Sequence, residues 1–107
     1  MKLIIAIVNK EDSEIAREEL LRAGFFITKL ATTGGFLSSG NTTFMMGVEE
    51  DKVDEVKALL SKFCRKRKQV VMSPFSMADP VVSPMPMEIE VGGATLFTLD
   101  IDRFEKL

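Results

Sequence analysis

The residues best suited to chemistry lie in one glycine-rich segment, residues 31–43, which reads Ala-Thr-Thr-Gly-Gly-Phe-Leu-Ser-Ser-Gly-Asn-Thr-Thr. Its glycines allow backbone N–H groups to approach a ligand closely, and Phe36 and Leu37 offer an apolar surface for a nucleobase. Hydroxyl groups that can bond phosphate oxygens come from Thr28, Thr32, Thr33, Ser38, Ser39 and Thr42. The segment therefore has the parts to hold a nucleotide. A tight hairpin whose Phe36 and Leu37 pack on their own sheet explains the same residues.

Part of this segment is close to a phosphate-binding loop. Residues 35–42 match the pattern G-x-x-x-x-G-K-[ST] except that Asn41 replaces the lysine. A P-loop needs that lysine on the phosphates and a helix N-terminus behind it, whereas Thr42 begins a strand-like run. The sequence therefore argues against nucleoside triphosphate hydrolysis by this route.

A second glycine pair, Gly92-Gly93, interrupts a strand-like segment, where glycine permits close approach of a ligand or of another backbone. A simple β-bulge explains the pair equally well. Asp100 and Asp102 read as a solvated strand edge, and Cys64 reads as a core residue on an apolar helix face. A basic run at a helix end is expected to stay solvated, and it comprises Lys62, Arg65, Lys66, Arg67 and Lys68.

Composition restricts the class of function. The 107 residues include no His and a single Cys, which removes the commonest general base and any multi-thiolate zinc site within one chain. We therefore expect a protein that is not an enzyme and holds no metal. With 14 basic and 16 acidic side chains and no Trp or Tyr, nucleic-acid binding is disfavoured. The longest apolar run, residues 3–8, is too short to span a membrane, so we expect a cytoplasmic protein.

The elements that must position these residues alternate between strand and helix. Strands are predicted over residues 3–8, 25–32, 42–48, 87–91 and 94–101, the last two joined through the Gly92-Gly93 bend. Residues 66–86, with all four prolines, are predicted to form one long structureless loop. The order predicts one α+β domain over residues 1–107, a doubled split βαβ unit of the ferredoxin-like type.

Two helices complete this unit. The first follows a capping region at residues 9–13, ends at Gly24, and pairs Glu18 with Arg22. Its apolar stripe is predicted to be Ile15, Ala16, Leu20 and Ala23. The second begins near Asp51, and its apolar face is predicted to be Val53, Val56, Leu60, Phe63 and Cys64. Both helices would cover one face of the sheet. Residues 3–8 are apolar on both faces, so we expect a closed homo-oligomer to bury the other face.

The amino-acid sequences of three segments resemble those of one known family. These are the opening Met-Lys-x-Ile-Ile-Ala-Ile-Val, the run Lys29–Leu37 continued by Gly40–Phe44, and Glu90–Thr95. Together they make the whole chain resemble the PII-like cyclic di-AMP receptor proteins of Gram-positive bacteria. The resemblance implies a homotrimer of ferredoxin-like subunits that binds cyclic di-AMP in clefts between neighbours. It also implies signalling to a downstream protein by loop ordering, without catalysis and without a cofactor.

The resemblance also implies site residues. Thr28 and Asn41 would hydrogen-bond the ligand, and Gly47 would offer backbone contacts. An adenine and a phosphate would be cradled by Gly34, Gly35, Phe36 and Leu37. Gly92 and Gly93 would face the site from the adjacent subunit.

Two positions depart from the family, since Gly24 and Phe26 stand where members usually carry Asn and Arg. Loss of the arginine would cost about 1.5–3 kcal/mol of charge-assisted contact with the ligand. A second reading is a trimeric structural or metal-tolerance protein of the same fold, whose glycine loops serve subunit packing alone. That protein would not respond to nucleotides.

Overall fold

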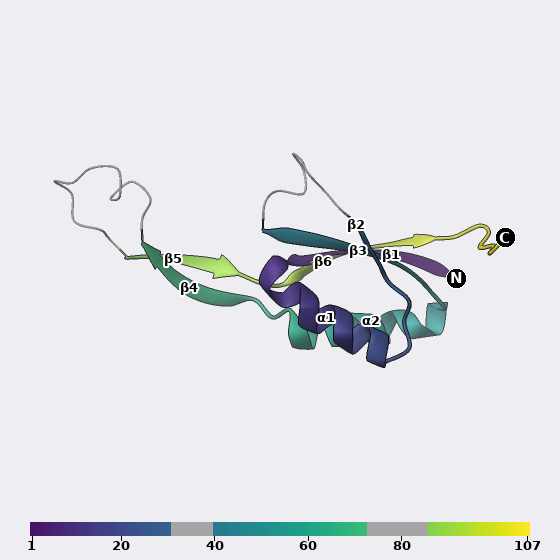
Figure 1. Cartoon of the computed structure of the whole chain (residues 1–107), viewed down its shortest axis with the longest axis horizontal. Helices are drawn as coiled ribbons and strands as arrows, with labels where there is room; N and C mark the ends of the chain where they lie inside the picture. Colours follow the sequence, from purple (N-terminus) through teal and green to yellow (C-terminus); the bar gives the residue numbers. More distant parts are fainter. Residues whose placement is uncertain (31–39, 73–85) are drawn as a thin grey trace.

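The computed structural model describes residues 1–30, 40–72 and 86–107 (Figure 1). Its elements are, in chain order, β1 (Lys2–Asn9), α1 (Lys10–Arg22), β2 (Thr28–Leu30), β3 (Asn41–Val48), a short 3-10 turn (Glu50–Lys52), α2 (Val53–Phe63), β4 (Arg67–Met72), β5 (Pro86–Val91) and β6 (Ala94–Asp100).

Four of the strands form one antiparallel sheet in the order β2-β3-β1-β6. β1 lies beside both β3 and β6, so each of the two βα units has a strand from the other unit inserted between its own strands. This is the doubled split βαβ arrangement that the sequence predicts, and it is compatible with a ferredoxin-like fold. Both helices cover the same face of the sheet (Figure 1).

The core lies between this sheet and the two helices. β1 directs Ile4, Ala6 and Val8 toward the helices, and each is at most 1% exposed. The other fully buried side chains of this core include Ala16, Leu20, Phe44, Val56, Leu60 and Cys64. The burial of Cys64 confirms its prediction as a core residue. Among the described residues, side chains from both βα units therefore pack into the same apolar core.

The opposite face of the sheet stays open in the single chain. We call it the open face, and its β1 side chains are Leu3, Ile5 and Ile7. On the edge strand β6, Phe97 and Leu99 lie opposite Ile5 and Leu3 and remain 48% and 46% exposed. The prediction of an uncovered apolar face is therefore confirmed for the single chain.

The prediction of a structureless loop over residues 66–86 is wrong at both of its ends. Arg67–Met72 and Pro86–Val91 pair as a separate antiparallel hairpin, β4–β5, which projects away from the four-stranded sheet (Figure 1). The β-branched Val70 and Val71 favour the extended backbone. Residues 73–85 lie outside the described part of the chain.

The two glycines at positions 92 and 93 separate the two sheets. Both have a positive φ, +84° and +80°, a region that L side chains rarely adopt. The strand over 94–101 therefore does not continue the strand over 87–91, because β5 pairs with β4 while β6 pairs with β1.

Several local predictions for α1 and β2 are wrong. Ile15 is 46% exposed, and the buried face of α1 instead carries Asp12 and Ser13 ahead of Ala16 and Leu20, while Ala23 is also exposed. Arg22 pairs with Glu19, one turn earlier on the helix at i−3, and not with Glu18. β2 is only three residues long and leaves residues 25–27 outside the strand.

The prediction of a solvated acidic edge at the end of β6 is confirmed for Asp100, whose side chain is 81% exposed. It also forms an ion pair with Lys2, the residue opposite it on β1. Asp102 lies beyond the end of β6 and does not share a strand face with Asp100. Within the described part of the chain, no helix has both the length and the apolar character needed to cross a bilayer.

Candidate ligand-binding site

A hollow of about 300 Å³ opens where four segments meet: the end of β1, the start of β3, the bend between β5 and β6, and the link between α2 and β4. We call it the asparagine hollow. It is lined by Ile7, Val8, Asn9, Asn41, Lys66, Gly92, Gly93, Ala94 and Thr95.

Two asparagines form one side of this hollow. Asn9 and Asn41 are cross-strand partners at the last position of the β1–β3 ladder. The Asn9 side-chain oxygen accepts a hydrogen bond from the backbone N–H of Glu11 at 2.8 Å and so caps α1. Next to it, the backbone N–H of Lys10 donates to the carbonyl of Gly40 at 2.7 Å. The chain entering β3 is therefore tied to the start of α1.

The opposite side is formed by the Gly92-Gly93 bend. An added Cβ at Gly92 would lie 2.3 Å from the carbonyl oxygen of Arg65, and one at Gly93 would lie 2.9 Å from Cγ of Lys66. The close approach of the Arg65 carbonyl requires glycine at position 92, and the positive φ favours glycine at both positions. The backbone of the pair lines the hollow at the same time.

The polar groups of the asparagine hollow suit a phosphate or a sugar hydroxyl. They comprise the amides of Asn9 and Asn41, the hydroxyl of Thr95 and the ammonium of Lys66, which has Glu90 as a distant partner at 4.0 Å. The described residues that line the hollow include no carboxylate. An anionic group would therefore meet hydrogen-bond donors and one positive charge, and it would compete with Glu90 for the Lys66 ammonium.

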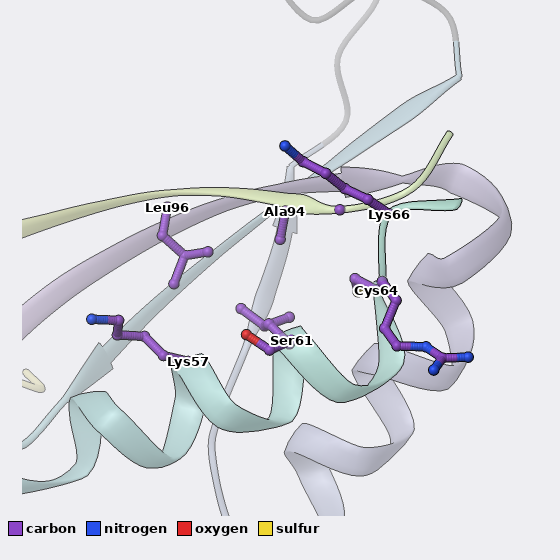
Figure 2. Close-up of a pocket in the computed structure, with 9 residues that line it drawn as sticks. Lys57, Ser61, Cys64, Lys66, Ala94 and Leu96 are labelled. Carbon is purple, nitrogen blue, oxygen red and sulfur yellow. The ribbon is translucent and has the colours of Figure 1, made fainter. Parts of the chain in front are cut away.

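A second hollow, of about 460 Å³, lies between α2 and β6. Figure 2 shows Leu96 and Ala94 on β6 facing the side of α2 that carries Lys57 and Ser61. The two hollows have three lining residues in common, Lys66, Gly93 and Ala94. They therefore adjoin one another on the same side of the molecule.

Cys64 also lines this second hollow, but its thiol is only 1% exposed. Burial, with a smaller contribution from the negative charge of Asp12, raises the pKa of the Cys64 thiol to about 11. A thiol with that pKa stays protonated near neutral pH, so Cys64 is a poor nucleophile. In the described part of the chain, no three His, Cys, Asp or Glu side chains gather at a distance that would hold a metal ion.

The structure brings three of the expected site residues together and separates two others from them. Asn41, Gly92 and Gly93 all line the asparagine hollow. The glycine pair therefore lies beside Asn41 of its own chain, whereas the resemblance implies that it faces the site from the adjacent subunit. Thr28 is exposed on the edge strand β2, opposite Met45 on the open face. Gly47 lies near the far end of β3, six residues or about 20 Å from Asn41. Gly34, Gly35, Phe36 and Leu37 fall outside the described residues.

Gly47 lines a third hollow, of about 380 Å³, together with Gly24 and Phe26. Phe26 is 82% exposed, and the ammonium of Lys106 lies 5.5 Å from its ring centroid. This is cation–π geometry. A positive charge therefore stands next to the position where the sequence lacks an arginine, and it is supplied by the C-terminal segment.

Sequence reasoning missed Asn9, Lys66 and Thr95 as lining residues. The sequence predicts Asn9 as part of a helix cap, which the structure confirms, and the N-cap position also places it among the residues that line the asparagine hollow. The sequence predicts Lys66 as one solvated member of a basic run, and its side chain is 75% exposed. The signal that could have found them is topological, because the split βαβ order puts the end of β1 beside the start of β3.

Comparison with known proteins gives two findings. A family model described as "Cyclic-di-AMP receptor" matches residues 1–107, the whole chain. The chain is also similar to the crystal structure of a functionally unknown protein from Pediococcus pentosaceus ATCC 25745, at 40% sequence identity and a TM-score of 0.74. That alignment covers 99% of this chain and 96% of the other.

Proposed function

This chain belongs to the cyclic-di-AMP receptor family, and from that premise we propose that it is a non-enzymatic receptor that binds cyclic di-AMP between the subunits of a homotrimer. The observation that carries the proposal is the family match over the whole chain. The resemblance read from the sequence motifs is confirmed by that match.

The asparagine hollow supports the ligand class. Cyclic di-AMP carries phosphodiester anions, riboses and adenines, and this hollow offers amide, hydroxyl and ammonium groups of the kinds that bond phosphates and riboses. In the sequence, Phe36 and Leu37 precede Asn41 by only a few residues. The resemblance implies that these two apolar side chains contact an adenine of the ligand.

The open face supports assembly. Phe97 and Leu99 are about half exposed beside the partly buried β1 side chains, and a face of this kind is normally covered by another surface. The separation of Asn41 from Gly47 supports sites between copies, since one small ligand cannot touch both residues of a single chain. In a cyclic trimer two different patches of the chain meet at each interface. The end of β3 that carries Asn41 would then lie near the end of the neighbour's β3 that carries Gly47.

The absence of catalysis is supported by the side chains available. The sequence has no His, and Cys64 is buried with a raised pKa. The described lining residues of the asparagine hollow offer amides, a hydroxyl and an ammonium, none of which serves as a general base near neutral pH. Signalling would then follow from rearrangement of the segments joined to the site, residues 31–39 and the β4–β5 hairpin.

Thermal melting with a ligand panel tests the proposal. The protein is melted with cyclic di-AMP, cyclic di-GMP, ATP and ADP in parallel, and cyclic di-AMP alone is expected to give a large shift. Ligand at 100 times Kd stabilises the folded state by about 2.7 kcal/mol per site. Absence of a selective response to cyclic di-AMP contradicts the proposed ligand, and leaves the structural or metal-tolerance reading.

Matched variants test where the ligand binds. Thr95→Val removes a hydroxyl that lines the asparagine hollow, while Thr98→Val makes the same change at an exposed β6 position outside it. Loss of one hydrogen bond to phosphate is expected to weaken binding about tenfold in Thr95→Val. Thr98→Val is expected to bind as the wild type does. Equal affinities for both variants would place the ligand elsewhere.

A second pair tests the assembly. Phe97→Asp puts a charge on the open face, and Leu21→Asp puts one on an exposed position of α1, where the leucine is 42% exposed. Light scattering coupled to size-exclusion chromatography is expected to show a trimer for Leu21→Asp and a monomer for Phe97→Asp. A trimer that survives both changes would show that the open face is not the interface.

A further inference from the structure

One arginine stands at the root of the β4–β5 hairpin, and its contacts differ from those of the rest of the basic run. Arg67 is the first residue of β4. Its Nη1 donates to Oδ2 of Asp12 and its Nη2 donates to Oδ1, both at 3.1 Å. This is a bidentate pair, the strongest and most directional form of arginine–carboxylate contact. The prediction that Arg67 is simply solvated is therefore wrong.

The carboxylate of this pair is largely withdrawn from water. The Asp12 side chain is 12% exposed, whereas Arg67 is 42% exposed and the more distant partner Glu11, at 3.7 Å, is 71% exposed. Asp12 lies on the first turn of α1. The hydrogen bonds that Arg67 donates to the Asp12 carboxylate are the main reason that the pKa of Arg67 is raised. The pair thus joins the root of the hairpin to the helix that Asn9 caps.

The same guanidinium also joins two further segments. Nη1 donates to the backbone carbonyl oxygen of Arg65 at 3.2 Å, in the link between α2 and β4. An added Cβ at Gly92 would lie 2.7 Å from Nη1 of Arg67 and 2.3 Å from the Arg65 oxygen. The bend between β5 and β6 therefore packs directly on the guanidinium, without room for a side chain.

The hairpin needs such an attachment. A two-stranded sheet is marginally stable by itself, and β4–β5 projects away from the four-stranded sheet (Figure 1). Arg67 lies opposite Val91 in the hairpin register, at the end nearest the body of the protein. A contact at this root fixes the direction in which the hairpin leaves the body.

Arg67 does not itself line the asparagine hollow, but one neighbour in the chain and one neighbour in space do. Lys66 precedes it in the chain, and Gly92 packs against its guanidinium. Displacement of the guanidinium would therefore move two lining residues of the hollow together with the hairpin. The ligand site and the hairpin would respond to the same ion pair.

We infer that Arg67, through its bidentate pair with Asp12, is a positioning residue that holds the Gly92-Gly93 wall of the asparagine hollow and the root of the β4–β5 hairpin as one unit. Its effect on ligand affinity rests on the proposed function, since it assumes that cyclic di-AMP occupies this hollow. Lysine cannot replace it, because an ammonium is a point charge and cannot donate to both carboxylate oxygens in the same fixed geometry.

Amide hydrogen exchange on the ligand-free protein tests the pair directly. The variants are Asp12→Asn, Arg67→Gln and the double variant, with Lys68→Gln as the matched control at the next position. Each single change is expected to speed exchange of the β4–β5 amides about tenfold. The double variant is expected to be no faster than Arg67→Gln, because the loss of Asp12 adds nothing once its guanidinium partner is absent. Exchange in β1 and β3 is expected to stay unchanged, which shows that the body remains folded.

The same proteins, together with Arg67→Lys, are then titrated with cyclic di-AMP. Asp12→Asn, Arg67→Gln and Arg67→Lys are expected to weaken binding about tenfold, with the double variant equal to Arg67→Gln. Lys68→Gln is expected to bind as the wild type does. Additive effects on exchange, or unchanged exchange of the hairpin amides, would overturn the inferred positioning role of the Arg67–Asp12 pair, called the clamp below. Wild-type affinity in the variants would overturn its role at the ligand site. Failure of the wild type to bind, with the exchange results as expected, would overturn the proposed function and leave the clamp standing.

Discussion

Replacing each of three glycines by alanine tests the packing around the asparagine hollow. Gly24, Gly93 and Gly92 have similar φ values, +94°, +80° and +84°, so an alanine at any of them adopts a similarly unfavourable backbone conformation. They differ in the space available to a methyl group. The series therefore separates backbone strain from steric crowding.

The magnitudes follow from the distances. A Cβ at Gly24 meets nothing within 4 Å, so Gly24→Ala is expected to cost only the strain, about 1–2 kcal/mol. At Gly93 the Cβ would lie 2.9 Å from Cγ of the flexible Lys66 side chain, which can move aside at small extra cost. At Gly92 the Cβ would lie 2.3 Å from the backbone carbonyl oxygen of Arg65. That oxygen can give way only if the backbone between α2 and β4, or the β4–β5 hairpin, moves as well. The crowding adds about 1–3 kcal/mol, for a total of about 2–5 kcal/mol.

The assay is urea denaturation of the three variants followed by circular dichroism, with the slope m compared to confirm that the transition is unchanged in kind. Free energies of unfolding are expected to fall least for Gly24→Ala, slightly more for Gly93→Ala and most for Gly92→Ala. Equal losses at positions 24 and 92 would refute the reasoning, because they would show that the bend is not packed against the Arg65 carbonyl and the Arg67 guanidinium.

Three further predictions concern groups outside the asparagine hollow or on its border. The Cys64 thiol is expected to react slowly with a thiol reagent in the native protein and rapidly in urea. Burial raises the pKa of this thiol from 9.0 to about 11, so the unfolded state loses the proton at a lower pH than the folded state does. The free energy of unfolding of the wild type is therefore expected to fall relative to that of Cys64→Ala as pH rises from about 9 to 11. Thr43 Oγ1 is buried without a hydrogen-bond partner among the described residues. Thr43→Val is therefore expected to leave the free energy of unfolding unchanged or to raise it by up to about 1 kcal/mol. A lower free energy of unfolding in urea denaturation would show that the hydroxyl has a partner. The hydrogen bond from Lys2 lowers the pKa of Asp100 from 3.8, so the pair stabilises the folded state above that pH and its contribution disappears as pH falls. Asp100→Asn is therefore expected to make the acid limb of the pH–stability curve shallower. An unchanged acid limb would show that the pair does not contribute to stability.

The sequence predicted the four-stranded body well because its signals are local and agree with one another. The apolar run at residues 3–8 becomes the central strand β1, and the helical spacing of Val56 and Leu60 becomes the buried face of α2. Gly24 ends the first helix with the positive φ expected of a helix stop. Each prediction needed only the period of the apolar residues and a cap or turn residue.

The remaining features depend on contacts between distant parts of the chain. Val70 and Val71 become strand because residues 86–91 pair with them, and the prolines nearby obscured that signal. Arg67 pairs with Asp12 across 55 positions, so no short motif could identify it within a run of like charges. Ile15 stays exposed because Asp12 and Ser13 take the buried side of the first turns of α1. Binding sites of this kind are set by topology, which gathers residues from four separate segments.

Isothermal titration of the wild-type protein with cyclic di-AMP, at a subunit concentration whose oligomeric state has been measured by light scattering, tests the central claim most directly. A receptor with sites between subunits predicts one ligand per chain, three per trimer, and no detectable binding of cyclic di-GMP under the same conditions. A monomeric protein, or one that takes up cyclic di-AMP and cyclic di-GMP equally or binds neither, would contradict the account.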